Sequence, residues 1–136
     1  MTDTPTAADL SVAERRTLAG VLDALIPPSA DGRLPGAGAA GVATHVEQVL
    51  GTLPDLRAMV VEGLRDLDGQ ARMQHHRAFA ECSAAERQAL VATQSFPYAL
   101  IPHTFVGYYQ QDAVLEAIGM EARPPHPKGY VLVEND

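Results

Sequence analysis

The side chains that could do acid–base chemistry lie in the last third of the chain, around His103. In the run SFPYALIPHTFVGYY the imidazole is accompanied by Tyr98, Thr104 and Tyr108. A histidine that acts as a general base needs a carboxylate or another group that orients its ring. No Asp or Glu stands at helical spacing from His103, which favours a buried or interfacial histidine with one hydrogen-bond partner. A small enzyme that uses His103 with Tyr98 or Tyr108 remains an alternative.

The five histidines and the single cysteine do not form a metal-binding pattern. His75 and His76 are adjacent, so on a helix their side chains point about 100° apart and cannot meet one ion without distortion. The spacings Glu-x-x-His, His-x-x-x-His and Cys-x-x-Cys, which bundle and zinc sites use, are absent from the sequence. Cys82 has no base positioned beside it and is interpreted as a packed thiol. The sequence predicts no metal site and no bound cofactor in this chain.

A glycine pattern typical of phosphate-binding loops occurs at Gly36, Gly38 and Gly41. In nucleotide-binding proteins this pattern follows a strand and opens a helix, because the glycines let the backbone approach the phosphates. Here it follows a Pro/Gly-rich loop, and no strand precedes it. We therefore interpret it as a turn that leads into a helix over residues 39–50, which Gly51 is predicted to end.

The charge balance of the chain excludes one large class of partners. The net charge is −7, and the only lysine is Lys128. Nucleic-acid binding needs a basic surface, so no nucleic-acid partner is expected. No apolar run approaches the roughly 20 residues that cross a bilayer, so direct insertion into a membrane is not expected either.

A twin arginine, Arg15-Arg16, stands before the apolar run LAGVLDALIPP. Asp23 interrupts this run, the run is short, and no small-residue cleavage site follows it. We interpret the segment as an amphipathic helix with exposed arginines, and expect no signal peptide in this chain. The expected location is the cytoplasm, or the periplasm by co-export with a partner that bears a signal.

Hydrophobic periodicity and capping motifs predict an all-α fold. Capping boxes at Ser11–Glu14 and Ser83–Glu86 mark two helix starts, and Pro27-Pro28 ends the first helix. Pro54 opens a further helix. Its apolar pattern either breaks near Gly69 or carries on through Met73, His76, Ala78 and Phe79. The expected fold is a small irregular bundle of five to seven short helices with an extended Pro-rich C-terminal arm.

The last third of the chain divides into an aromatic helical segment and that arm. The segment from Phe96 to Ile118 is apolar and aromatic, and Pro102 is predicted to kink it. Three prolines within residues 121–130 lack backbone donors and fix φ, which favours a polyproline-type arm. The predicted organisation is a flexible leader at 1–10, a helical domain at 11–120 and an extended arm at 121–136.

Rings in the aromatic segment and donors on the arm form a candidate contact surface. A buried tyrosine needs a partner for its hydroxyl, and neighbouring tyrosines beside an arm are typical of an interface as well as of a core. A preordered arm loses little entropy when it binds. The residues predicted to contact a partner are Phe105, Tyr108, Tyr109, Arg123, Pro124, Pro125, His126, Pro127, Lys128 and Tyr130.

Several of these segments resemble a known family in their type and order. They are Leu22-Asp23-Ala24-Leu25-Ile26-Pro27, Leu34-Pro35-Gly36-Ala37, the block Phe96 to Tyr109 with Thr104 and Gly107, then Val114, Leu115, Ala117, Ile118 and Gly119, and finally Arg123-Pro124-Pro125 and Pro127-Lys128-Gly129-Tyr130. On these residues the chain resembles the gluconate 2-dehydrogenase subunit 3 family, the small subunits of bacterial flavin-dependent sugar and polyol dehydrogenases. The resemblance covers residues 12–130.

The resemblance implies a non-catalytic subunit that binds and stabilises, in a chaperone-like way, a large subunit of the glucose–methanol–choline oxidoreductase type. That flavoprotein would hold FAD and oxidise the sugar or polyol, and some relatives add a cytochrome c subunit that passes electrons to quinone. FAD is therefore expected in the partner and not in this chain. A homo-oligomeric regulatory helical domain is a further alternative.

Overall fold

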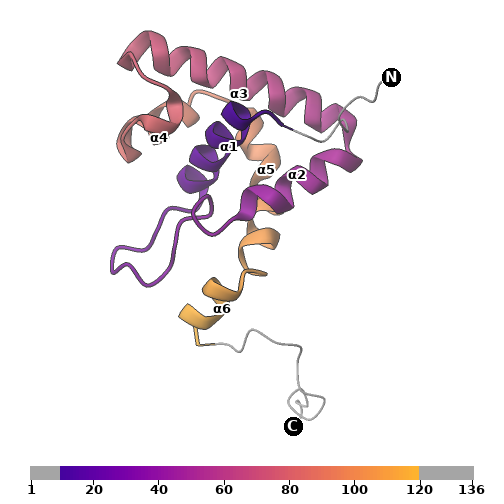
Figure 1. The fold of residues 1–136 in the computed structure, drawn as a ribbon, viewed down its shortest axis with the longest axis vertical. Coiled ribbons are helices and arrows are strands. Elements are labelled where there is room, and N and C mark those ends of the chain that lie inside the picture. Colours follow the sequence, from indigo (N-terminus) through magenta and orange to yellow (C-terminus); the bar gives the residue numbers. More distant parts are fainter. Residues whose placement is uncertain (1–9, 120–136) are drawn as a thin grey trace.

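The computed structural model describes residues 10–119, and within them it contains helices and no strand. In chain order the elements are α1 (Val12–Leu25), α2 (Val42–Thr52), α3 (Pro54–His75), the 3₁₀ turn η1 (Phe79–Glu81), α4 (Ala84–Val91), α5 (Phe96–Tyr108) and α6 (Asp112–Ala117). Helix α3 runs along one side of the fold, and α1, α2, α4 and α5 pack beneath it (Figure 1). The predicted all-α bundle is confirmed, although α3, with 22 residues, is longer than the short helices expected.

Local signals in the sequence set the start and end of α1. The Ser11 hydroxyl accepts from the Glu14 N–H, and the Glu14 carboxylate accepts from the Ser11 N–H, both at 3.0 Å, so the predicted capping box is present. The helix ends at Leu25, just before the two prolines. The twin arginine lies in the folded helix, where Arg15 Nη2 is 2.9 Å from Glu47 Oε2 of α2. The amphipathic-helix interpretation is confirmed.

The core is one cluster to which every α-helix contributes. Its largest fully enclosed side chains come from the inward stripes of α1, α2, α3 and α5 together with η1, and burial of such side chains is the main favourable contribution to folding. The largest of them are Tyr108, Phe79, Leu18, Leu22, Leu50, Leu64, Leu67 and Leu100. Leu10, which the sequence assigned to the leader, is also buried.

At two glycines the structure shows whether a helix ends: the predicted helix end at Gly51 is wrong, and the helix through Gly69 is continuous. α2 begins at Val42 and continues through Gly51 to Thr52, and Leu53 alone separates it from α3. Of the two alternatives at Gly69, the continuous helix is the one observed, and α3 ends at His75. A glycine costs a helix interior only about 1 kcal/mol. Burial of Leu67 and Ala71 on either side of Gly69 stabilises α3 there.

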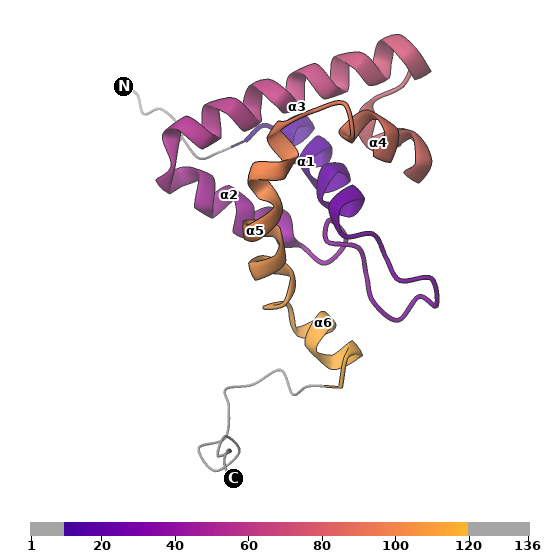
Figure 2. The ribbon, with the colours of Figure 1, turned by 180° about the vertical axis from the view of Figure 1, so that it is seen from behind.

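Two glycines let α5 lie close to its neighbours. A Cβ on Gly63 of α3 would be 2.2 Å from the ring of Phe96, and one on Gly107 would be 2.7 Å from the ring of His45 on α2. α5 therefore crosses α2 and α3 in close contact, and it passes through Pro102 as one helix (Figure 2).

The hydroxyl of Tyr108 ties α5 to the loop after α1, because it donates to the carbonyl oxygen of Pro35 at 2.7 Å. Replacing Tyr108 with phenylalanine keeps the ring and leaves the Pro35 acceptor without this donor. We expect Tyr108→Phe to lower the free energy of unfolding by about 1 kcal/mol in urea titrations. Tyr109→Phe, on the adjacent half-exposed ring, is the matched control and should unfold like the unmodified chain. An equal decrease in the free energy of unfolding in both variants would contradict a stabilising role for the Tyr108–Pro35 hydrogen bond.

Candidate partner interface

Helix α5 presents an apolar stripe to solvent, which we name the α5 outer face. It consists of Tyr98, Pro102, Phe105, Val106 and Tyr109, spaced at i, i+4, i+7, i+8 and i+11 along one side of the helix. The exposed fractions are 67% for Tyr98, 42% for Phe105, 52% for Val106 and 50% for Tyr109. Figure 2 shows α5 on the near side of the fold with no other helix in front of it.

The opposite side of α5 is apolar as well. Phe96, Leu100, Thr104 and Tyr108 are buried on the side of α5 that packs against the rest of the bundle, formed by α1, α2 and α3, and the helix contains no Asp, Glu, Lys or Arg. A helix that is hydrophobic all round is normally enclosed on every side. Within residues 10–119, however, nothing covers the α5 outer face. It is the surface on which another molecule would bury apolar area most favourably.

The exposed rings are held in place by the buried one. The rings of Tyr108 and Tyr109 meet edge to face with centroids 5.1 Å apart, and Phe105 stacks on Tyr109 at 6.2 Å and 12°. Burial and the neighbouring Tyr109 raise the pKa of the Tyr108 hydroxyl, so this group stays protonated and keeps donating to Pro35. Rings ordered before binding lose little entropy on contact.

The structure divides the predicted contact residues into three groups. Phe105 and Tyr109 are exposed and available for contact. Tyr108 is only 2% exposed, which corrects its placement on the surface: its ring is packed in the core, and its hydroxyl bonds to Pro35 in the loop after α1. The arm residues Arg123, Pro124, Pro125, His126, Pro127, Lys128 and Tyr130 lie outside the described residues. Tyr98 and Val106 are exposed on the same stripe but were not among the predicted contact residues, because on a helix that is apolar all round no pattern in the sequence marks the outward side.

No acid–base set assembles around His103 within residues 10–119. Its ring is half-buried in α5, no carboxylate bonds to it, and Tyr108 uses its hydroxyl on Pro35. In the same part of the chain no group of three or more His, Cys, Asp or Glu side chains is placed to hold a metal ion. Cys82 is buried, with its sulfur 3.5 Å from the Ala78 carbonyl, which agrees with a packed thiol.

The glycine turn binds a carboxylate of its own chain. Asp23 Oδ1 accepts from the N–H groups of Gly38 and Ala39 at 2.8 and 3.3 Å. A Cβ on Gly38 would lie 2.1 Å from the carbonyl oxygen of Ala19, so the turn is pressed against α1. Asp23 occupies the amides that a phosphate would use, and the interpretation of this segment as a turn is confirmed.

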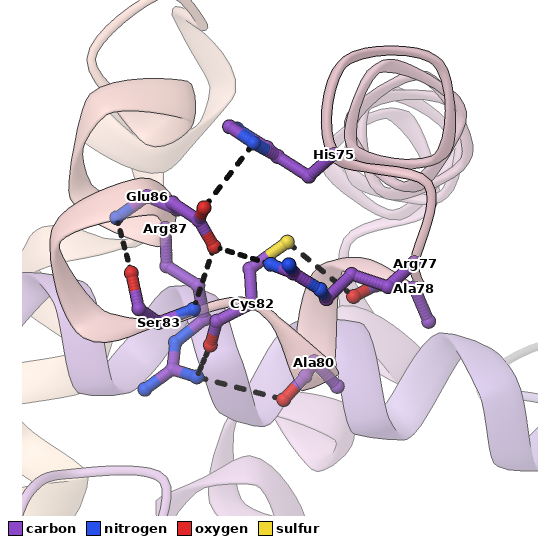
Figure 3. A network of polar contacts seen from close by, with 8 residues as sticks. All are labelled: His75, Arg77, Ala78, Ala80, Cys82, Ser83, Glu86 and Arg87. Carbon is purple, nitrogen blue, oxygen red and sulfur yellow. Dashed lines mark hydrogen bonds and ion pairs between the residues drawn. The ribbon is translucent and has the colours of Figure 1, made fainter.

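A polar network joins the end of α3 to the start of α4 (Figure 3). Glu86 completes the second capping box with Ser83, and its carboxylate also meets Arg77 Nη1 at 2.8 Å and His75 Nδ1 at 3.3 Å. The backbone hydrogen bond from Ser83, together with the charges of His75 and Arg77, keeps the pKa of Glu86 below its ordinary value. These contacts are structural, since each group is used within the chain.

A second carboxylate, Asp68 of α3, makes stability depend on pH. Burial favours the neutral form of Asp68, but hydrogen bonds from Arg72 and from the Phe79 N–H outweigh burial and lower its pKa. A group whose pKa is lower in the folded state stabilises the fold above its unfolded pKa and loses that contribution as the pH falls.

We therefore expect the stability difference between the unmodified chain and Asp68→Asn to be largest above about pH 5 and to shrink toward pH 3. Urea unfolding across this range measures it, and the subtraction removes the contributions of Asp31 and Glu86, whose pKa values are also lowered. A difference that grows on acidification would contradict the assignment.

Fold and surface together define a class: a small all-helical protein whose most distinctive feature is an apolar contact face. The family model for gluconate 2-dehydrogenase subunit 3 matches residues 12–114, so the chain belongs to that family. The match spans α1 to α5, including the α5 outer face, and ends within α6. No match was found among curated proteins or among solved structures. No helix within residues 10–119 has the length and apolar character to cross a membrane.

Proposed function

We propose that this chain is a non-catalytic accessory subunit that binds and stabilises the large subunit of an FAD-dependent sugar or polyol dehydrogenase of the glucose–methanol–choline type. The family, a subunit of a dehydrogenase complex, supports a hetero-oligomer with other subunits. The observation that carries the proposal is the α5 outer face, an uncharged aromatic surface on a chain with net charge −7. The stabilisation is chaperone-like: covering this face buries apolar area on both proteins.

The flavin chemistry in this proposal belongs to the partner. FAD is held by the large subunit, and a cytochrome c subunit would accept its electrons where the complex contains one. This chain contributes binding area, with Phe105 and Tyr109 as anchors, because aromatic residues at the centre of an interface account for much of the binding energy. The complex resides in the cytoplasm, or in the periplasm when the large subunit bears the export signal.

Purification of the intact complex through a tag on this chain tests the proposal. We expect a second, larger polypeptide in fixed stoichiometry, with a flavin absorption spectrum and dehydrogenase activity toward a sugar or polyol. Mass spectrometry identifies that polypeptide by its dinucleotide-binding sequence. Elution of the chain without a flavoprotein would contradict the proposal, and a homo-oligomer in light scattering would then favour the regulatory-domain alternative.

A further inference from the structure

The carbonyl oxygen of Tyr98 is an acceptor without its helical donor, in the middle of the α5 outer face. In an α-helix the carbonyl of residue i accepts from the N–H of residue i+4. For Tyr98 that residue is Pro102, which lies inside α5 and has no N–H. The ring of an interior proline also crowds the carbonyl four residues before it and turns that carbonyl outward.

This acceptor lies where a partner would cover it. Tyr98 and Pro102 are both exposed, so the carbonyl between them is on the solvent side of α5. A backbone carbonyl on an exposed face is satisfied by water when no protein donor pairs with it. An interface that covers the α5 outer face removes this water, and a buried acceptor with no donor opposes binding. A partner that fits this face must therefore supply a donor at this point.

We propose that the large subunit places an N–H donor side chain on the Tyr98 carbonyl, beside the ring of Pro102. An arginine fits best, and the inference rests on the proposed function. The chain uses the same chemistry twice: Arg33 Nη2 donates to the Ala117 carbonyl at 2.7 Å, and Arg87 Nη1 donates to the Cys82 carbonyl at 2.6 Å. α5 carries no cation that would repel a guanidinium, and the ring of Tyr98 offers it a π face.

Two substitutions of Pro102 distinguish the effect of the unpaired carbonyl on binding from the effect of losing the proline ring. Pro102→Ala restores the N–H, which pairs with the Tyr98 carbonyl inside the helix. Pro102→lactic acid, introduced by nonsense suppression, has the same methyl group but an ester oxygen in place of the N–H. We expect Pro102→Ala to weaken binding to the purified large subunit about tenfold, the effect of one hydrogen bond. We expect Pro102→lactic acid to bind like the unmodified chain.

The stability of the free chain must also be measured, because a change in stability could by itself alter binding. Pro102→Ala should raise the thermal midpoint of the free chain by roughly 4 °C or more, because the helix gains a bond. His76→Gly is the matched control: His76 caps the C-terminal end of α3 at φ 60°, where glycine is favoured, so this variant should also gain stability and bind normally. Should Pro102→Ala fail to fold, Pro102→Gln carries the same N–H and takes its place.

Equal affinity of the alanine and lactic acid variants, whether normal or reduced, would overturn the inference, because the N–H would then make no difference. This result is distinguishable from failure of the proposed function. That failure appears as normal binding after Phe105 and Tyr109 are both replaced, or as the absence of a flavoprotein partner.

Discussion

Replacing Phe105 and Tyr109 together with serine is expected to weaken association with the large subunit about 100-fold. Both rings stand on the α5 outer face, 42% and 50% exposed, and they stack on each other. Central aromatic residues of interfaces each contribute about 2 kcal/mol or more, and a tenfold change corresponds to 1.4 kcal/mol, so about 100-fold allows for incomplete additivity. Isothermal titration calorimetry of this chain with the purified large subunit measures the change in affinity.

The matched control removes two exposed apolar side chains elsewhere on the surface. Met59 and Met73 of α3 are 42% and 81% exposed, and Met59→Ser with Met73→Ser should leave the affinity unchanged. The free Phe105→Ser, Tyr109→Ser chain should keep its helical circular dichroism, because the core ring Tyr108 is intact. Equal weakening by both pairs of substitutions would mean that general surface hydrophobicity, and not the α5 outer face, drives association.

Gly38→Ala is expected to destabilise the free chain by about 3 kcal/mol, at the upper end of the cost of inserting a methyl group into a packed site. The new Cβ would lie 2.1 Å from the backbone oxygen of Ala19. A helix backbone cannot move aside as a side chain can, so the turn must leave α1. The hydrogen bonds from Gly38 and Ala39 to Asp23 would be lost with it.

The same substitution at Gly69 should raise the stability of the chain instead of lowering it. Gly69 is inside α3, and a methyl group added there would have no neighbouring atom within 4 Å. Alanine favours a helix interior over glycine by about 0.5–1 kcal/mol. Urea unfolding of Gly38→Ala and Gly69→Ala side by side checks both expectations. Two variants of equal stability would show that the glycine turn is not pressed against α1 as described.

The starts of α1 and α4 were predictable because their causes are local. Both capping boxes, Ser11–Glu14 and Ser83–Glu86, form from residues three apart and are present in the structure. The inward stripe of α1 was predictable for the same reason, since Leu18, Val21 and Leu22 repeat at helical spacing beside a polar face. Such patterns depend only on residues within one helix and do not require knowledge of the helices packed against it.

The features that position the candidate interface depend on contacts far apart in the sequence. α5 has no polar face, so periodicity could not tell that Tyr108 faces inward and Tyr109 outward. The close approach of Gly38 to Ala19, and of Gly63 to Phe96, appears only when the helices are packed. A glycine in the sequence indicates a turn, a break or a close contact equally well. Tertiary packing decides among them.

Cysteine labelling of the α5 outer face tests the central claim most directly. The only native cysteine, Cys82, is buried, so a cysteine introduced at Val106 reports on its own surroundings. In the free chain Val106→Cys and Met73→Cys should both react readily with a maleimide. In the purified complex we predict that Val106→Cys becomes protected while Met73→Cys reacts as before. Unchanged reactivity of Val106→Cys in a complex that contains the flavoprotein would contradict the account.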